Sequence, residues 1–546
     1  MNHLHKFNRD AAKRYLQNIV FVDDEIYSRV SGKPVISTLD IPAFQSPFAT
    51  GARDVSAPGL ESAIEEKIPY HPQHLVQSFA KLGMVCALYE PENNFATAQG
   101  SELFNLCERA DVMILDWDLY KHDGRNILPL IANLVDESQN SVPHHSRLCV
   151  IYSTKPELDR IASSVYDFLR AKKLEVQDVQ KPATLIAGST RIIVLGKPGV
   201  PNRTAEIKLL EVAEEDLAER VIDEFAIMHQ GVLPSYALRG MAAIRRNSKK
   251  ILDKFHREMD GAFLLHRALV LSDEDAFDQL PELLAEEVLA VILDDQAPNE
   301  TFVNLTADAV AELPLSDFIW PVQGPNRQAG EIVRKFFNEG KAGIAGDFKF
   351  DDKNLKKKID EIHIALGCAE SYGDKKLASL FNVRTRYFKA KLPTLGFGSI
   401  VRWRENNDVN FPFIYGFCLM PTCDGMRLNH EEGSRTSFPF WTLKATNSKG
   451  RGIIVKNREN DFISLVAVVG KPRELLWIDT FKPATSGLVT SYESGGSYYF
   501  DGAEHKLEWV AQLKPGHAQR VANDIGQSFS RVGVVEAEWL RLTTER

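Results

Sequence analysis

The chain has 546 residues, of which 44% are apolar, so it is long enough for three domains with hydrophobic cores. Its formal net charge of −9 argues against a general nucleic-acid binder, because such proteins usually carry a basic surplus. No apolar stretch reaches the roughly 18 residues that a membrane span needs, and the start of the chain lacks the apolar core of a signal peptide, so the sequence predicts a cytoplasmic protein without a membrane partner.

Four apolar runs near the start of the chain each stop at a residue able to hold a metal or a phosphate. They end at Asp23, Asp116, Ser153 and Lys197. Such runs are typical of buried parallel strands, and the carboxyl ends of neighbouring parallel strands face one crevice. The sequence therefore predicts an α/β fold with a doubly wound, five-stranded parallel sheet of the flavodoxin-like type. These four residues and Asp24 would be neighbours at one edge of it.

Three carboxylates at one strand edge would repel one another and raise each other's proton affinity unless a divalent cation lay among them. A site made of oxygen ligands favours Mg²⁺, which binds a few carboxylates together with waters and phosphate oxygens. One carboxylate could then attack a phosphoryl group and form an aspartyl phosphate. Lys197 and the Ser153 hydroxyl would bind the oxygens of the transferred group.

The stretch from Asp116 to Gly124 reads Asp-Trp-Asp-Leu-Tyr-Lys-His-Asp-Gly. It resembles the phosphoacceptor stretch Asp-x-x-Leu-Pro-x-x-Asp-Gly of the receiver domain of two-component response regulators, and only the proline, at Tyr120, is missing. The acidic pair before this stretch, and the Ser and Lys-Pro after it, stand in the order that receivers have. The resemblance implies an expanded receiver domain, with the sheet described above.

The resemblance also implies a role for each site residue. Asp116 is similar to the phosphorylated aspartate, Asp23 and Asp24 to the acidic pair that holds Mg²⁺ with the main-chain carbonyl of Asp118, Ser153 to the residue that senses the phosphoryl group, and Lys197 to the family's lysine. A cognate histidine kinase is the implied phosphoryl donor. The protein would then be a phosphoacceptor that dephosphorylates itself rather than an enzyme.

Two features of this sequence depart from the receiver pattern. A stretch rich in Pro, Ser, Gly and Ala at about 26–70 stands where the first helix normally begins. Long loops inside compact domains usually have a function or are mobile, so three interpretations of this insertion stay open: a lid over the acidic pocket, a docking surface, or a disordered segment. Val194, three positions before Lys197, replaces the Tyr or Phe that moves with the Ser or Thr in many receivers, which puts the usual route of signal output in doubt.

Two charged residues are expected to tune the lifetime of the phosphoryl group. Asp118 and Lys155 lie two positions beyond Asp116 and Ser153, at sites whose side chains overhang the phosphate in receivers. Their opposite charges could pair, or they could position an attacking water. Either arrangement would change the rate of dephosphorylation.

Beyond the sheet, the pattern divides the rest of the chain. The receiver is expected at 14–230, with an amphipathic helix over 205–229 at its end. A mainly helical region follows at 235–390. Its basic cluster at 245–250 could contact phosphate backbones, but the pattern favours a solvated helix face. From 395 to 546, period-two patterns and Gly/Asn/Asp turns predict a β-rich domain with a terminal helix over 515–529. The helices could form a homodimer bundle or the core of a middle domain.

No DNA-reading or catalytic motif is recognisable after the receiver, which favours output through protein contacts or a receiver that acts as a phosphate sink. Partners would be a second response regulator or an effector. Expanded receivers of this kind resemble those of Detocs-type antiphage two-component systems. Two alternatives stay open: a haloacid-dehalogenase-like phosphatase that uses Asp116 and Asp118, and a DNA-binding transcription regulator. The order of motifs disfavours the phosphatase, whose second acidic pair follows the lysine.

Overall fold

The computed structural model describes residues 3–26, 72–140, 146–178, 182–269 and 273–295, a few positions between 335 and 340, and most of 373–529. The chain divides into two compact units, residues 1–269 with 275–312, and residues 270–274 with 313–546. Nearly all of the insertion predicted at about 26–70 lies outside the described residues. The division into three domains stays a prediction, since most of 296–372 also lies outside them.

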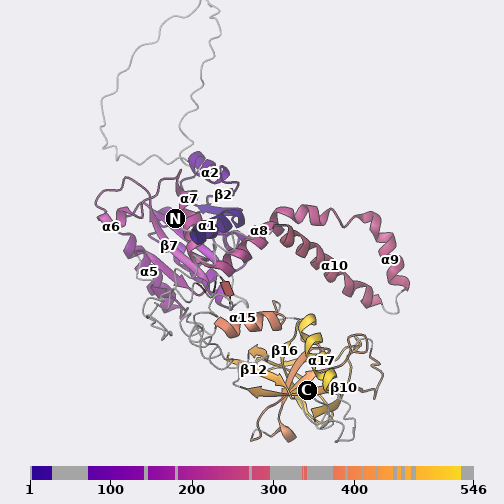
Figure 1. The fold of residues 1–546 in the computed structure, drawn as a ribbon. Helices are drawn as coiled ribbons and strands as arrows, with labels where there is room; N and C mark the ends of the chain where they lie inside the picture. Colours follow the sequence, from indigo (N-terminus) through magenta and orange to yellow (C-terminus); the bar gives the residue numbers. More distant parts are fainter. Residues whose placement is uncertain are drawn as a thin grey trace, which may run out of the picture. The chain divides into compact units, whose positions relative to one another are not determined.

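The first unit is built on a seven-stranded sheet with the order β2-β1-β3-β4-β7-β6-β5 (Figure 1). Its strands are β1 (Asn18–Val22), β2 (Val85–Tyr89), β3 (Val112–Asp116), β4 (Arg147–Ser153), β5 (Gln177–Asp178), β6 (Thr184–Ala187) and β7 (Thr190–Gly196). Every residue of β3, β4 and β7 is buried, as continuous apolar runs predict for strands covered on both faces. The predicted α/β class is confirmed.

Five of these strands are parallel, because β1 pairs in parallel with β2 and β3, and β4 with β3 and β7. The predicted five-stranded core is therefore present, but two antiparallel strands extend it. β6 pairs with β7 and β5 pairs with β6. This hairpin accounts for much of the long interval between Ser153 and Lys197.

Helices cover the sheet in two groups. α1 (His3–Tyr15) contacts α7 (Leu217–Met228) and α8 (Val232–Leu252), and α7 also contacts α2 (Pro72–Ala80). The second group is α3 (Glu102–Arg109), α4 (Ile127–Asn140) and α5 (Leu158–Ala171), in which α4 contacts both others. Two more helices follow α8, namely α9 (Asp260–Leu269) and α10 (Asp273–Asp294). None of the helices in the described part of the chain is long and apolar enough to cross a bilayer.

The single helix predicted over 205–229 is wrong. The structure has a short α6 (Ala205–Lys208), an irregular segment, and then α7. The break arises because the chain after α6 bonds to the end of β7: the Gly196 N–H donates to the Leu210 carbonyl at 2.9 Å, and the Val212 N–H donates to the Gly196 carbonyl at 3.0 Å. Those backbone groups cannot take part in a continuous helix at the same time.

The interpretation of the basic cluster at 245–250 as a solvated face is wrong for Arg245. Its guanidinium donates to both carboxylate oxygens of Asp111, at 2.7 and 2.9 Å, and to the Tyr15 carbonyl at 2.9 Å. It also lies 4.2 Å from the centre of the Tyr15 ring. Because Asp111 precedes β3, this contact fastens α8 to the sheet of the first unit.

The second unit contains a nine-stranded antiparallel sheet with the order β11-β12-β10-β9-β8-β16-β15-β14, in which β13 also pairs with β10 (Figure 1). Its strands are β8 (Ser399–Trp403), β9 (Ile414–Cys418), β10 (Thr436–Thr446), β11 (Ile453–Lys456), β12 (Phe462–Ala467), β13 (Leu476–Phe481), β14 (Tyr492–Ser494), β15 (Ser497–Asp501) and β16 (Lys506–Gln512). Helices α15 (Gly373–Asn382) and α17 (Pro515–Phe529) belong to the same unit. The predicted β-rich character is confirmed.

Candidate functional site

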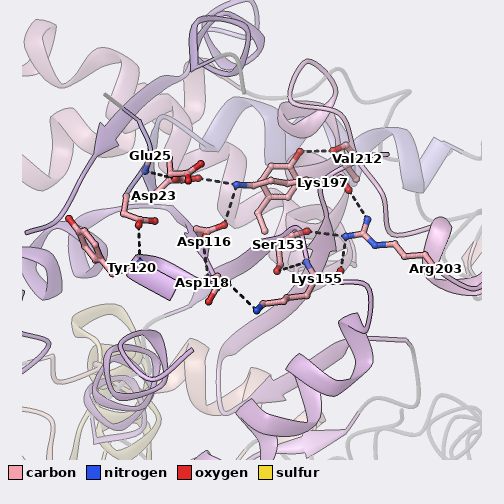
Figure 2. A network of polar contacts seen from close by, with 12 residues as sticks. Asp23, Glu25, Asp116, Asp118, Tyr120, Ser153, Lys155, Lys197, Arg203 and Val212 are labelled. Atoms are coloured by element: carbon pink, nitrogen blue, oxygen red, sulfur yellow. Dashed lines mark hydrogen bonds and ion pairs between the residues drawn. The ribbon is translucent and has the colours of Figure 1, made fainter. Parts of the chain in front are cut away.

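The ends of β1, β3 and β7 bring three charged side chains together (Figure 2). The Lys197 Nζ lies 3.0 Å from Asp23 Oδ2 and 3.2 Å from Asp116 Oδ1. Asp23 is only 2% exposed and Asp116 8%. The predicted convergence of these residues at one edge of the sheet is therefore observed, and one ammonium group lies between two buried carboxylates.

Ser153 reaches the same edge through the strand register. Asp116 pairs with Tyr152, so Ser153 lies one residue beyond the partner of Asp116. Ser153 in turn pairs with Gly196, so Lys197 lies one residue beyond the partner of Ser153. Ser153 is fully buried, its carbonyl accepts the Lys197 N–H at 2.9 Å, and its Oγ accepts the Lys155 N–H at 3.1 Å. This position fits the predicted role of binding an oxygen of a group held on Asp116.

Asp24 is held by the loop that follows β3. Its Oδ2 accepts the Tyr120 N–H at 2.8 Å, and the Tyr120 hydroxyl donates to the Pro91 carbonyl. Tyr120 has a φ of 55°, a left-handed conformation that the ring of proline forbids. The missing proline of the receiver pattern therefore has a structural reason, since this position supplies a backbone donor that proline lacks.

The same loop carries Asp118, which forms an ion pair with Lys155. The Lys155 Nζ lies 3.1 Å from Asp118 Oδ2 and 3.4 Å from Asp123 Oδ1. The other oxygen of Asp118 accepts the Asp123 N–H at 2.9 Å, so both carboxylate oxygens are engaged. Of the two arrangements considered for Asp118 and Lys155, the structure has the pair (Figure 2).

Burial and charge oppose each other at this edge. Burial raises the pKa of Asp116 to about 6, even though the neighbouring Lys197 lowers it. Burial likewise raises the pKa of Asp24, against the Tyr120 N–H that lowers it. For Lys197, burial lowers the pKa, but the Asp116 and Asp23 carboxylates outweigh it and raise the value above that of an ordinary lysine. The lysine is therefore a fixed positive charge.

The donors at this edge are chemically suited to Mg²⁺, because all of them are oxygens from carboxylates and a carbonyl. In the arrangement seen here, Lys197 bridges Asp23 and Asp116, and the described residues include no group of three or more His, Cys, Asp or Glu side chains placed to hold a metal. The Asp118 carbonyl accepts the Lys121 N–H at 2.8 Å, which leaves it one lone pair. The donor set fits the cation, and the geometry shown is the one bridged by lysine.

Sequence reasoning missed Arg203, whose guanidinium lies beside Ser153 and Lys155 (Figure 2). It donates to the carbonyls of Lys197, Ser153 and Lys155, at 2.7, 3.1 and 2.8 Å. Its side chain is fully buried. The only hint in the sequence is Gly196, where an added Cβ would lie 2.2 Å from the Arg203 Nη1.

Comparison with known proteins agrees with this geometry. Residues 15–202 match the family model of the response receiver domain. No curated protein matches the chain, and no solved structure does. The matched span contains all four strand ends of the site and stops one residue before Arg203. Residues 15–202 of this chain are therefore a response receiver domain, the module of response regulators in two-component signalling.

Proposed function

We propose that this receiver accepts a phosphoryl group on Asp116 from a histidine kinase in the presence of Mg²⁺. The observation that carries the proposal is the buried Asp116 carboxylate held 3.2 Å from the Lys197 ammonium group, with Asp23 on the other side of that lysine. Asp23, Asp24, Asp116 and the Asp118 carbonyl would hold the cation. When bound, Mg²⁺ would neutralise charge on the phosphoryl oxygens.

The transfer needs few protein groups. One Asp116 oxygen would attack phosphorus while the bond from phosphorus to the histidine nitrogen of the kinase breaks and that nitrogen keeps the electron pair. The Asp118 N–H, which donates to Asp116 Oδ2 at 2.9 Å, orients the carboxylate. Lys197 and the Ser153 hydroxyl would bind oxygens of the new aspartyl phosphate, and later attack of water on phosphorus would restore the carboxylate and release phosphate.

The geometry favours an acceptor over a phosphatase. In the phosphatase alternative, Asp118 would act as the general acid, but Lys155 and the Asp123 N–H occupy both of its carboxylate oxygens. The alternative of a DNA-binding regulator would use the helical region, and Arg245 in the basic cluster of α8 is paired with Asp111. Neither alternative gains support from the described residues.

Output through protein contacts is supported by the helices that follow the sheet. Several leucines on α9 and α10 are half or more exposed, among them Leu264, Leu265, Leu269, Leu283 and Leu293. Apolar side chains gathered on exposed helices are typical of protein-binding surfaces. If the protein instead acts as a phosphate sink, as in the antiphage systems it resembles, phosphorylation would leave its association with other proteins unchanged.

Phosphorylation followed by mass spectrometry tests the proposal. We expect a small phosphodonor such as acetyl phosphate, with Mg²⁺, to add one phosphoryl group to the wild type and none to Asp116→Asn. Asp136→Asn is a matched control, because Asp136 is an exposed aspartate on α4 of the same domain. A label on any other residue, or equal labelling of Asp116→Asn, would contradict the proposal.

A further inference from the structure

Arg203 joins both phosphoryl-binding strand ends to a segment beyond the matched receiver. Its Nη1 donates to the carbonyl of Lys197, and its Nη2 donates to that of Ser153. These two residues are the ones proposed to bind the phosphoryl oxygens. Guanidinium donors have a fixed planar geometry, so the position of this one rigid group depends on the backbone positions of both Lys197 and Ser153.

Besides the Lys155 carbonyl, Arg203 also contacts the segment that interrupts the predicted helix. Its Nη1 lies 3.2 Å from Glu211 Oε1, while its Nε has no hydrogen-bond partner among the described residues. Glu211 lies between Leu210 and Val212, which bond to Gly196 at the end of β7. The segment 204–212 is therefore held to the site by one buried arginine and by the backbone of one glycine.

Tyr152 forms a second connection between the end of β4 and the segment 204–212. It precedes Ser153, is fully buried, and its hydroxyl donates to the Val212 carbonyl at 2.7 Å. Its ring centre lies 5.6 Å from the Lys197 Nζ. Many receivers have, at the position of Val194, a Tyr or Phe that moves with the Ser or Thr. Val194 is instead a completely buried aliphatic residue, and its side chain has no polar group that could change hydrogen-bond partners. One chain of contacts thus leads from Ser153 and Lys197 through Arg203 to the segment 204–212.

We infer that Arg203 is a positioning residue which couples occupancy of Asp116 to the segment 204–212. The inference rests on the proposed function. A phosphoryl group on Asp116 would hold Ser153 and Lys197 through its oxygens, and their carbonyls would fix the guanidinium and, through it, Glu211. The segment presents Leu209, which is 77% exposed, so a change in its mobility alters the surface that a partner meets.

Hydrogen exchange of the full chain, with and without Mg²⁺ and beryllofluoride, tests the coupling. Beryllofluoride mimics an aspartyl phosphate, and its fluorine NMR signal reports binding independently. On binding, we expect amide exchange of the wild type at 209–212 to slow about fivefold or more, the lower end of ordinary coupling between sites. In Arg203→Met, we expect beryllofluoride still to bind, with slower exchange at 153–155 and no change at 209–212.

The control is Arg160→Met. Arg160 lies on α5, the helix that follows residues 153–155, and its 81% exposed side chain pairs only with Glu157 among the described residues. It should respond as the wild type does. If Arg203→Met does not fold, Arg203→Lys and Glu211→Gln carry the test, and each should weaken the response at 209–212 while leaving that at 153–155 intact.

Three outcomes would overturn the inference. In the first, beryllofluoride binds to the wild type but exchange at 209–212 does not change, which leaves the proposed function standing. In the second, the Arg203 and Glu211 variants transmit the response as the wild type does. In the third, no fluorine signal appears for the wild type, which removes the proposed function and the coupling together.

Discussion

Buried charges serve different purposes in the two sheets of this protein. In the nine-stranded sheet, Arg402 on β8 and Glu508 on β16 form a two-bonded pair, with distances of 2.8 and 2.9 Å. Asp479 is buried there too, and it accepts N–H groups of Thr480, Ala503 and His505. Arg402 and Glu508 balance each other's charge and join the neighbouring strands β8 and β16, whereas several backbone N–H groups hold the Asp479 carboxylate.

At the carboxyl edge of the receiver sheet, buried carboxylates and their cationic partners are not equal in number. One ammonium group, that of Lys197, is shared by Asp23 and Asp116, while Asp24 accepts the Tyr120 N–H and forms no ion pair within the part of the chain that the structure describes. Carboxylates therefore outnumber the cations that face them. In a closed pair each charge compensates the other, so removing one partner leaves a buried charge without compensation. An excess of one charge at a buried edge instead marks a place that a further charged group can occupy.

The largest expected effect comes from breaking the closed pair. Arg402→Met leaves the Glu508 carboxylate buried without its partner, which should destabilise the second unit by about 3 kcal/mol. The double variant Arg402→Met/Glu508→Leu should recover most of that loss, because it removes both charges. Urea unfolding, together with hydrogen exchange of β8 and β16 amides, measures the change. A loss below about 1 kcal/mol in the single variant would contradict the closed-pair interpretation.

The second effect concerns the cation. Tyr120→Pro removes the N–H that holds Asp24 and forbids the left-handed backbone, so Mg²⁺ should bind about tenfold more weakly, as expected for one lost hydrogen bond to a charged group. Tyr120→Phe keeps the N–H and removes only the hydroxyl, so its affinity should stay close to that of the wild type. Isothermal titration calorimetry measures both. Equal affinities for the proline variant and the wild type would show that Tyr120 does not orient Asp24.

The third effect is on stability and its pH dependence, measured without metal. Asp116 has a folded-state pKa of about 6 against an ordinary 3.8, so between these values the folded state binds more protons than the unfolded state. The free energy of unfolding should therefore fall as the pH rises from about 4 to about 6, and then level off. Asp116→Asn should remove the part of this dependence that Asp116 causes and leave the part that the raised pKa of Asp24 causes. The variant should be more stable by about 1 kcal/mol at pH 7, because part of the gain is offset by the lost contact with Lys197.

Thermal unfolding across this pH range tests the third prediction, with Asp136→Asn as the control that keeps the wild-type slope. If Asp116→Asn were less stable than the wild type at pH 7, the edge would be a closed network like that of Arg402, and the contrast between the two sheets would be wrong.

The parallel core and its charged edge could be predicted because their signals are local. An apolar run that stops at Asp116 or Lys197 predicts both a buried strand and a charged group at the end of that strand. Parallel pairing then brings such strand ends together. The same reasoning placed the terminal helix, which the structure has as α17 over Pro515–Phe529. The predicted metal ligands and the roles of the site residues stay predictions.

The features that were missed depend on backbone geometry or on distant partners. Nothing near Arg245 in the sequence indicates Asp111, and nothing near Arg203 indicates three carbonyls. The helix over 205–229 has the apolar spacing of one helix, but bonds to Gly196 interrupt it. Strand β10 contains Pro439, a residue that normally argues against an inner strand, and yet β10 pairs with three neighbours.

The smallest expected effect concerns how long the phosphoryl group lasts. Both oxygens of Asp118 are engaged, so this carboxylate is poorly placed to orient water, and its main action is to hold Lys155. Asp118→Asn should release Lys155 toward the phosphoryl oxygens and lengthen the half-life of the phosphorylated form up to about fivefold, which matches the strength of a partly exposed ion pair. Lys155→Met removes the positive charge that would lie near the phosphoryl oxygens, so this variant should not lengthen the half-life of the phosphorylated form.

Loss of phosphoryl label over time, measured by mass spectrometry, separates the possibilities for these two variants. A shorter half-life in Asp118→Asn would mean that the carboxylate repels the attacking water. An unchanged half-life in both variants would mean that the ion pair only braces the loop after β3. In that case Lys155, like Arg402, would belong with the closed pairs, and the excess of negative charge at the edge would consist of Asp23, Asp24 and Asp116 alone.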